Sequence, residues 1–276
     1  MTDHEHWQLD GSAPELYERY LVPAITSLWA ADLLDRARPK PKEAVLDVAC
    51  GTGVVTRLVA ARTGGRRIVG LDLNPGMLEV ARSASNSCTP VEWVEGSALS
   101  LPFMDGSFDL VLCQLGLQFF PDRPRALREM RRVLAPSGRI ALSVYSAIER
   151  TPAANAFAAV LDQCLGPGAS AIKRAEHIFP EARELGALLT EAGFEQVAVD
   201  TVTQRITFPS VFDYVRFQLI ATPMAGLLRD RNDAERETII MRIASDTQSL
   251  LDPEMVRDGC LSFPQEAHVA TALQAQ

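Results

Sequence analysis

Apolar residues recur along this chain at two spacings, and the two alternate from residue 44 onward. Short runs rich in Val, Ile and Leu, of the kind that form buried strands, predict strands over 44–49, 67–73, 91–96, 107–114, 139–145, 194–208 and 268–273. Residues that repeat at the helical period predict helices over 54–62, 75–84, 124–134, 153–165, 182–192 and much of 210–257. Repeated strand–helix alternation with short loops predicts a parallel sheet with helices on both faces.

Before residue 44 the pattern is helical. Ser12 and Glu15 have the spacing of a capping box, with Pro14 in the first turn, and Pro23 is expected to divide the stretch into two helices. We therefore expect an α/β fold: a seven-stranded, mostly parallel sheet whose last strand is antiparallel, with a helical cap. One domain, 1–276, would comprise an N-terminal cap (1–40), a core (41–150), a helical insert or lid (151–180 and 209–258) and C-terminal strands (181–208 and 259–276).

Composition narrows the class of protein. The net charge of −8 disfavours nucleic acid as a partner, because a negative surface repels phosphate backbones. The five cysteines contain no CxxC pair, which argues against a disulfide framework or a metal site and for a reducing cytoplasm. The first residues are polar and acidic, unlike a signal peptide, and no apolar run reaches membrane-spanning length. We expect a cytoplasmic protein without metal or membrane, and a homodimer is compatible with the sequence.

The turn after the first predicted strand reads "DVACGTG", from Asp47 to Gly53. Ligands of doubly wound sheets bind beyond the carboxyl ends of the strands. Ala49, Gly51 and Gly53 remove side-chain bulk there, so a ligand can lie against the backbone at the start of a helix. Asp47, at the end of the strand, can fix the loop or reach a ligand amine. This turn is a candidate cofactor site.

Asp72 ends the second predicted strand, nineteen positions after Gly53. An acid at that place accepts hydrogen bonds from the two ribose hydroxyls of a nucleoside. A dinucleotide is the alternative cofactor, but its G-x-G-x-x-G fingerprint would need a glycine where Thr56 stands, and no P-loop sequence is present. A turn that only joins strand to helix is the other alternative.

The sequence resembles the class I S-adenosylmethionine-dependent methyltransferases, especially the ubiquinone/menaquinone-biosynthesis branch (methyltransferase type 11). The stretches that carry this resemblance are "VLDVACGTG", "GLDLNPGMLEVAR", "LPFMDGSFDLVLCQLGLQFFPD" and "REMRRVLAPSGRIALSV". The resemblance implies a Rossmann-like fold, S-adenosylmethionine as cofactor, S-adenosylhomocysteine as product and a small-molecule methyl acceptor. The apolar and aromatic residues of 209–230 suggest an apolar or aromatic acceptor.

The resemblance also assigns site residues. Asp47, Ala49 and Gly51 would surround the methionine portion, and Asp72 would bind the ribose. The remaining cofactor residues would be Leu73, Met77, Gly96, Ser97 and Ala98 around the adenine, and Gln114 near the methyl group. Ser97 stands where relatives often have an acid, and Gln118 and Phe119 stand where many carry a histidine pair.

No motif singles out a catalytic side chain. A methyl group on sulfonium is already a strong electrophile, so alignment and exclusion of water can supply much of the rate enhancement. The candidates are Tyr20, in the N-terminal segment that closes over the cofactor in relatives, with Gln114 and Gln118. Two alternatives stay open: a non-catalytic protein that binds the cofactor or its product, and an NAD(P)-dependent oxidoreductase.

Overall fold

One mixed sheet organises the chain in the computed structural model, which describes residues 12–64, 66–85 and 89–274. The sheet has eight strands in the order β3-β2-β1-β4-β5-β8-β6, with β7 paired to β8. The strands are β1 (Ala44–Val48), β2 (Arg67–Asp72), β3 (Glu92–Glu95), β4 (Phe108–Gln114), β5 (Leu134–Tyr145), β6 (Phe194–Phe208), β7 (Val256–Arg257) and β8 (Cys260–Gln274). The α/β fold and the mostly parallel sheet are confirmed, and the strand count of seven is wrong by the two-residue β7.

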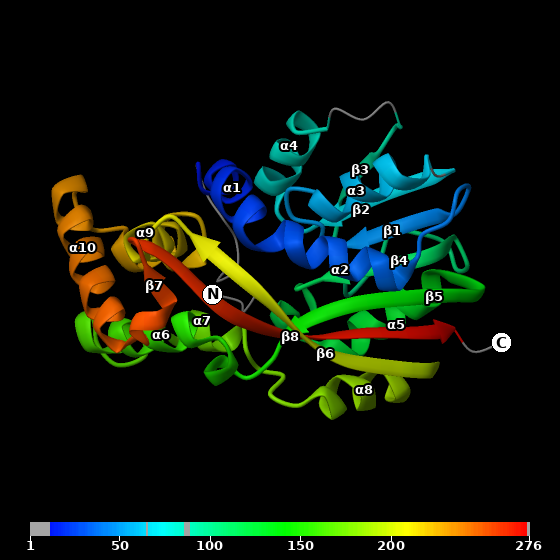
Figure 1. Cartoon of the computed structure of the whole chain (residues 1–276). Helices are drawn as coiled ribbons and strands as arrows, with labels where there is room; N and C mark the ends of the chain where they lie inside the picture. The colour runs from blue at the N-terminus through cyan, green and yellow to red at the C-terminus, as the bar shows by residue number, and fades with distance from the viewer. Residues whose placement is uncertain (1–11, 65, 86–88, 275–276) are drawn as a thin grey trace.

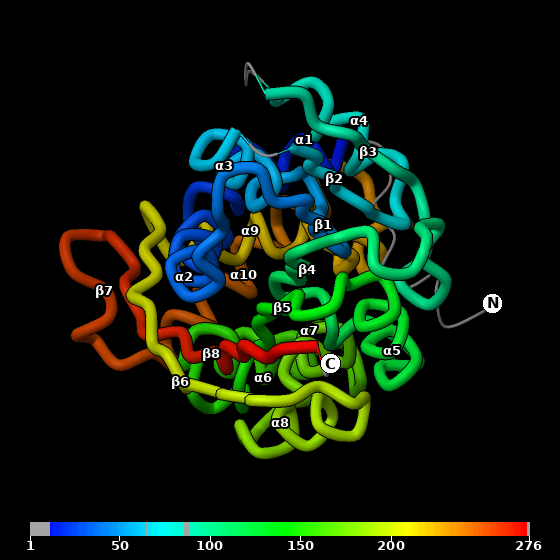
Figure 2. The backbone as a smooth tube through the Cα atoms, turned by 90° about the vertical axis from the view of Figure 1, so that its right-hand side faces the viewer, coloured from blue at the N-terminus to red at the C-terminus, as the bar shows by residue number. Residues whose placement is uncertain are grey.

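The first five strands pair in parallel, whereas β8 runs antiparallel between β5 and β6. The order reverses between β1 and β4, where the chain crosses from one half of the sheet to the other. A crevice opens at such a switch point, beyond the carboxyl ends of the strands. The predicted antiparallel strand over 268–273 is confirmed, although β8 starts earlier, at Cys260, and forms a hairpin with β7 at one side of the molecule (Figure 2).

Helices cover both faces of the sheet, as predicted (Figure 1). Val45 and Leu46 are neighbours on β1 and therefore point to opposite faces. Val45 belongs to the apolar cluster with α2 (Ser27–Ala37) and α3 (Val54–Thr63). Leu46 belongs to the cluster with α5 (Arg123–Val133) and α8 (Ala182–Glu191). These two clusters make the core that fixes the strand ends.

The N-terminal segment stays helical from Ala13 to Ala37, so the predicted division at Pro23 is wrong. A short α1 (Ala13–Leu16) leads into the π-helix η2 (Tyr17–Thr26), which contains Pro23 and continues into α2. The wider i→i+5 turn is rare and occurs often at functional sites. The predicted capping box does not form, because the Ser12 side chain makes no capping hydrogen bond.

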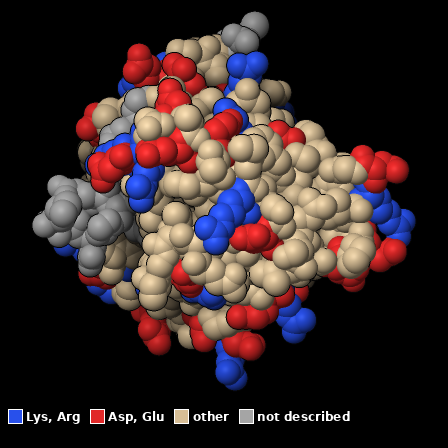
Figure 3. Space-filling view, turned by 90° about the vertical axis from the view of Figure 1, so that its left-hand side faces the viewer, with Lys and Arg blue, Asp and Glu red and all other residues tan. Residues whose placement is uncertain are grey.

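A helical cap lies beyond the carboxyl ends of the strands. It contains α6 (Pro152–Leu165), α7 (Ala171–Ala175), α9 (Val211–Ile220) and α10 (Asp233–Leu250). Buried residues of η2, α6, α9, α10 and the adjoining parts of β6 and β8 form one apolar cluster, so the N-terminal and late segments pack together. Figure 3 views the molecule from the side of α9 and α10, where acidic and basic side chains are interspersed.

Local sequence signals explain several element ends. Asn74 caps α4 (Pro75–Ser83) by accepting hydrogen bonds from the backbone N–H groups of Gly76 and Met77. Gly64 ends α3 in the left-handed conformation. The strand predicted over 139–145 begins earlier, at Leu134, so that the "PSG" stretch of 136–138 lies inside β5, with Ser137 at a φ of 63° and a register shift against β4.

Short helical segments complete the fold: η3 (Leu117–Phe119), η4 (Ile148–Arg150), η5 (Pro223–Leu228) and η6 (Pro253–Met255). Within the described ranges, no helix combines the length and the apolar character that crossing a membrane requires. The same ranges contain no group of three or more His, Cys, Asp or Glu residues placed to hold a metal ion.

Candidate active site at the carboxyl end of the sheet

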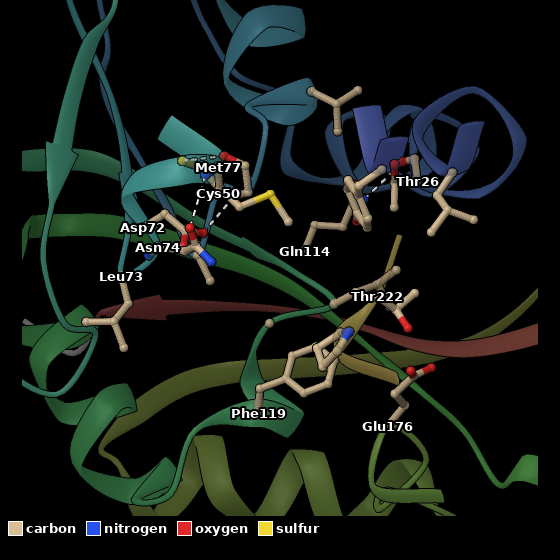
Figure 4. A pocket seen from close by; sticks show the side chains of 18 of the residues that line it. Thr26, Cys50, Asp72, Leu73, Asn74, Met77, Gln114, Phe119, Glu176 and Thr222 are labelled. Carbon is tan, nitrogen blue, oxygen red and sulfur yellow. Dashed lines mark hydrogen bonds between the residues drawn. The ribbon is translucent and has the colours of Figure 1, made fainter. Parts of the chain in front are cut away.

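A cavity of about 280 Å³ opens beyond the carboxyl ends of the five parallel strands β1 to β5. Each of these strands contributes a residue at or just beyond its end: Asp47, Asp72, Gly96, Gln114 and Tyr145. Figure 4 shows that Asp72 and Asn74 lie at one end of the cavity and Glu176 and Thr222 at the other, with Gln114 and Phe119 between them. The cavity therefore has a first end, at Asp72, and a second end, at Glu176.

The turn after β1 lines the first end with backbone. Ala49 and Gly51 lie in the left-handed region, with φ values of 57° and 55°. A Cβ added at Gly51 would meet no atom within 4 Å, so the bare backbone of Gly51 faces open space. This is the arrangement expected where a ligand approaches the main chain closely.

Gly53 has a different role from the one predicted. It precedes α3 at a φ of 82°, and a Cβ there would lie 2.2 Å from the Trp93 ring. Among the described residues, Gly53 is not part of the cavity lining, whereas Val54 and Val55 are. Gly53 is thus required for packing of the turn against β3.

Asp72 connects the two neighbouring loops. Its Oδ2 accepts from the backbone N–H of Gly51 (2.8 Å) and its Oδ1 accepts from that of Asn74 (2.9 Å). Burial raises the pKa of this carboxyl, against backbone hydrogen bonds that lower it. Each carboxylate oxygen can accept a further hydrogen bond, so the loops are held in place while acceptor capacity remains for a ligand.

Asp47 is 2% exposed, and only one of its oxygens is engaged. Oδ2 accepts from the Thr56 hydroxyl (2.5 Å), whereas Oδ1 is buried without a hydrogen-bond partner. Burial raises the pKa of Asp47 to about 7, because a charged carboxylate is poorly solvated there. Asp47 Oδ1 can accept a hydrogen bond, and no described residue donates one to it.

Gln114 supplies a second acceptor of this kind. Its Nε2 donates to the backbone carbonyl of Thr26 (3.0 Å), which joins β4 to η2, and its Oε1 is buried without a partner. Two residues that line the cavity thus each carry a buried acceptor oxygen without a hydrogen-bond partner.

The other predicted cofactor residues also line the cavity. Met77 is 9% exposed, at the start of α4, while Leu73 is 42% exposed at the rim. Gly96, Ser97 and Ala98 follow β3, and the Ser97 hydroxyl accepts from the backbone N–H of Leu99 (3.2 Å). Ala49, Gly51, Asp47, Asp72 and Gln114 complete this set.

Two predicted catalytic candidates lie outside the lining, as far as the chain is described. Tyr20 stacks on Phe217 with ring centroids 4.1 Å apart. Gln118 is 2% exposed with both side-chain polar atoms unpartnered, and its carbonyl accepts from Arg123. Tyr17, one helical turn before Tyr20, lines the cavity instead. The wider π-helical turn places Tyr17, Leu21 and Ile25 on the cavity side.

The two histidines among the described residues lie outside the lining as well. Burial lowers the pKa of His177 to about 3, and its Nδ1 is 2.7 Å from the carbonyl oxygen of Ser146, so the ring is neutral and donates there. The Nδ1 of His268 is 3.0 Å from the Thr201 hydroxyl on β6. His4 and His6 lie outside the described residues.

The second end of the cavity holds polar residues that the sequence analysis missed. Lys173 of α7, Glu176 beyond it and Gln218 of α9 are 5%, 8% and 3% exposed, and all line the cavity. Lys173 Nζ donates to Glu176 Oε2 (2.7 Å) and to Gln218 Oε1 (2.9 Å). No sequence motif distinguishes these three polar residues from the exposed polar residues of other helices, so the sequence did not predict them as site residues.

Three tyrosines complete that end: Tyr17, Tyr145 and Tyr214. Burial raises the pKa of each hydroxyl, and the charge of Glu176 raises it further in all three. Glu176 therefore lies within electrostatic reach of three phenol groups that remain protonated. Gln265 of β8 also lines the cavity and accepts from Trp29 (2.7 Å).

Known proteins match this chain in both sequence and fold. The methyltransferase domain family matches residues 46–142, which include the turn after β1, Asp72 and Gln114. A 2-phytyl-1,4-naphthoquinone methyltransferase of Thermosynechococcus vestitus is 34% identical over 195 residues, covering 66% of this chain and 87% of that protein. The chain belongs to the S-adenosylmethionine-dependent methyltransferases.

Two further comparisons agree. A demethylmenaquinone methyltransferase of Corynebacterium kroppenstedtii is 30% identical over 207 residues, covering 70% of this chain and 86% of that protein. The solved phosphoethanolamine N-methyltransferase 2 of Haemonchus contortus, in complex with S-adenosyl-L-methionine, shares the fold with a TM-score of 0.60 at 17% identity, over 95% of this chain and 57% of that one. The methyltransferase uses S-adenosylmethionine as its cofactor, and the dinucleotide alternative is set aside.

The first end of the cavity fits this cofactor. The ammonium of its methionine portion brings N–H donors, and Asp47 and Gln114, which line this end, each have one acceptor oxygen without a hydrogen-bond partner. Its ribose brings two hydroxyl donors, and its bulk requires the open space beside Gly51. When bound, the cofactor supplies an electrophilic methyl group on sulfur.

Proposed function

We propose that this methyltransferase methylates a small, apolar or aromatic acceptor of the quinone type. The observation that carries the proposal is the two-ended cavity. The first end, at Asp47 and Asp72, is the cofactor end. The second end, which we call the acceptor end, has a wall of apolar and aromatic side chains, among them Leu21, Ile25, Leu115, Phe119 and Ala221. The naphthoquinone named for the Thermosynechococcus relative is a flat aromatic molecule of this class.

The cofactor contacts are part of the proposal. Asp72 would accept from the ribose hydroxyls with the lone pairs that its loop contacts leave free, and Asp47 and Gln114 would accept from the ammonium group. Leu73 and Met77 would pack on the adenine, together with the backbone of 96–98. Ala49 and Gly51 would lie against the methionine portion, since a side chain at 51 would occupy that space.

The residues of this chain would act by position. Gln114 is anchored to the Thr26 carbonyl of η2, so it connects the cofactor end with the N-terminal helix that walls the acceptor end. The cap buries the acceptor end, which excludes water from the line between donor and acceptor. Holding two reactants in line can be worth about 7 kcal/mol or more of the activation barrier.

The test has two measurements on the whole chain. Calorimetric titration with S-adenosylhomocysteine measures the cofactor site, and incubation of S-adenosylmethionine with 1,4-dihydroxynaphthalene under reducing conditions, read by mass spectrometry, measures transfer. We expect micromolar product binding and a singly methylated naphthalene. No binding up to about 1 mM, which corresponds to only about 4 kcal/mol of affinity, would contradict the proposal.

Assembly and location are separate expectations. A small molecule is the partner we propose; the homodimer, the cytoplasmic location and the lack of nucleic-acid binding expected from the sequence remain proposals. Light scattering of the purified chain measures its oligomeric state, and a gel-shift titration with duplex DNA measures nucleic-acid binding.

A further inference from the structure

The acceptor end of the cavity contains a buried ion pair in a wall that is otherwise mostly apolar and aromatic. The pair is Lys173 and Glu176, whose side chains are 7% and 11% exposed. Taking both charges out of water costs several kcal/mol per ion, and apolar residues of the same volume often stabilise a fold as well or better. A pair that serves only stability is therefore an expensive solution at this place.

The hydrogen-bonding capacity of this group is only partly used. Glu176 receives Lys173 on Oε2, and Gln218 receives it on Oε1, so Glu176 Oε1 and Gln218 Nε2 have no partner among the described residues. Both atoms keep some accessible surface, although both residues are buried and line the cavity. An acceptor on Glu176 and a donor on Gln218, two residues tied to the same ammonium group, thus keep free hydrogen-bonding capacity in the lining of the cavity.

The net charge of the group selects the kind of guest. Lys173 neutralises Glu176, so neither a cation nor an anion gains a full opposing charge. A hydroxyl group fits better, because it donates one hydrogen bond and accepts another. The surrounding Tyr17, Tyr145 and Tyr214 supply aromatic surface for the ring that carries such a hydroxyl.

We propose that Glu176 and Gln218 form a recognition site for a hydroxyl group on the aromatic methyl acceptor, with Lys173 as the positioning residue that holds both. The hydroxyl donates to Glu176 Oε1 and accepts from Gln218 Nε2. This inference rests on the proposed function, because it presumes that the second end of the cavity receives the acceptor.

The test compares two probes of nearly equal shape, 1-naphthol and 1-methylnaphthalene, by equilibrium binding to the protein saturated with S-adenosylhomocysteine. The quantity measured is the ratio of their dissociation constants, in wild type and in the Lys173→Met/Glu176→Leu double variant. Comparing the ratio between proteins cancels the different hydration of the two probes. We expect the preference for 1-naphthol to fall about tenfold in the double variant, with 1-methylnaphthalene bound as well or better.

Two further variants sharpen the result. Glu176→Gln keeps the shape, and its amide oxygen can keep the contact with Lys173 while an NH2 donor replaces the Oε1 acceptor, so we expect the ratio to fall about threefold. Glu43→Gln removes a carboxylate paired with Arg139 away from the cavity, and it should leave the ratio unchanged within about twofold. If the double variant does not bind S-adenosylhomocysteine, the ratio of the two dissociation constants measured for Glu176→Gln tests the hydroxyl site.

The outcomes separate the two proposals. Wild-type protein that does not bind S-adenosylhomocysteine contradicts the proposed function. Wild-type protein that binds it, with a probe ratio that neither the double variant nor Glu176→Gln changes, overturns the hydroxyl site and leaves the methyltransferase function standing. Binding of neither probe to the saturated wild-type protein overturns the hydroxyl site as well.

Discussion

The two ends of the cavity are assembled in different ways. At the cofactor end, the lining side chains discussed above belong to the last residues of β1, β2 and β4 and to the segments that directly follow β1, β2 and β3, within residues 47–114. At the acceptor end, the polar and aromatic residues come from η2, β5, α7, α9 and β8, which are spread over most of the chain. The first end is thus fixed by local turn geometry, whereas the second depends on how the cap packs.

The two ends also treat charge differently. The acids Asp47 and Asp72 have no cation beside them among the described residues; burial raises the pKa of both, and their hydrogen bonds come from backbone groups and a hydroxyl. Glu176 has Lys173 at 2.7 Å. An unneutralised acid favours a cationic or donor-rich ligand, while a neutral pair favours an uncharged polar group.

The largest effect is expected for Asp72→Ala, which acts on the cofactor end alone. It removes both proposed ribose contacts, each worth about 1.5–2 kcal/mol, so the affinity for S-adenosylhomocysteine should fall about 100- to 1000-fold in calorimetry. Asp200→Ala is the control, since Asp200 lies on β6 with its side chain 66% exposed. Equal affinities of Asp72→Ala and wild type would show that the nucleoside is bound elsewhere.

A matched pair of glycine substitutions separates packing from ligand contact within one turn. Gly53→Ala should lower the free energy of unfolding by about 2–4 kcal/mol, because the new methyl group meets the Trp93 ring in a left-handed backbone. Gly51→Ala shares the backbone strain without that clash, and should cost only about 1–2 kcal/mol.

Cofactor affinity should give the opposite order for this pair. Gly51→Ala should weaken binding of S-adenosylhomocysteine more strongly than Gly53→Ala, when both folded proteins are titrated by calorimetry. Urea unfolding measures the stability difference. If both substitutions reduce stability and affinity in proportion, the proposed division between the two glycines is wrong.

Asp47 should make binding at the cofactor end depend on pH. The pKa of this acid is raised from 3.8 to about 7, so its ionised, ammonium-binding form grows as pH rises through 7. Affinity for S-adenosylhomocysteine should therefore rise about tenfold between pH 6 and 8. Calorimetry at both pH values measures it, and Asp47→Asn should bind weakly at both.

The same shift has a consequence for stability of the unliganded protein. Because the folded state binds the Asp47 proton more tightly than the unfolded state, the contribution of Asp47 is greatest below pH 3.8 and is lost as pH rises to about 7. Between pH 5 and pH 8 this loss is about 2–3 kcal/mol. Urea unfolding at several pH values should show that the free energy of unfolding falls more steeply with pH in wild type than in Asp47→Asn. Parallel pH profiles of the two proteins would contradict this expectation.

The smallest change in affinity is expected for the ion pair between α3 and η2. Arg57 of α3 donates to Glu18 of η2 (2.6 Å), with side chains 19% and 23% exposed. Glu18→Gln should cost about 1 kcal/mol of unfolding free energy and change the affinity for S-adenosylhomocysteine less than about threefold. A loss of affinity as large as that of Asp72→Ala would mean that closure of η2, rather than the loops, governs cofactor binding.

Much of the fold could be predicted because its signals are local. The apolar runs of β1 to β6 and the Asn74 cap mark their elements directly, and β6 spans the predicted 194–208. Errors arose where tertiary packing overrides a local rule. Pro23 does not end the N-terminal helix because η2 absorbs it, and "PSG" stays within β5 because the strand can bulge beside β4.

The candidate site divides along the same line. The residues predicted to bind the cofactor all line the cavity except Gly53, where a side chain would clash with the ring of Trp93. Tyr20 stacks on Phe217 outside the lining while Tyr17 lines the cavity, because membership of the N-terminal segment does not tell which of its tyrosines faces the sheet ends. Lys173, Glu176 and Gln218 belong to no recognisable motif, and only the tertiary structure brings Gln218 of α9 to the Lys173–Glu176 pair.

The sequence by itself determined the parallel sheet and the place of the cofactor end, because strand periodicity and glycine-containing turns act over a few residues. It also placed Asp47 and Asp72 at strand ends, where parallel strands bring such residues together. The tertiary structure alone decided the acceptor end. Its charges lie in helices whose mutual placement depends on burying one shared apolar cluster, and that burial involves residues from both halves of the chain.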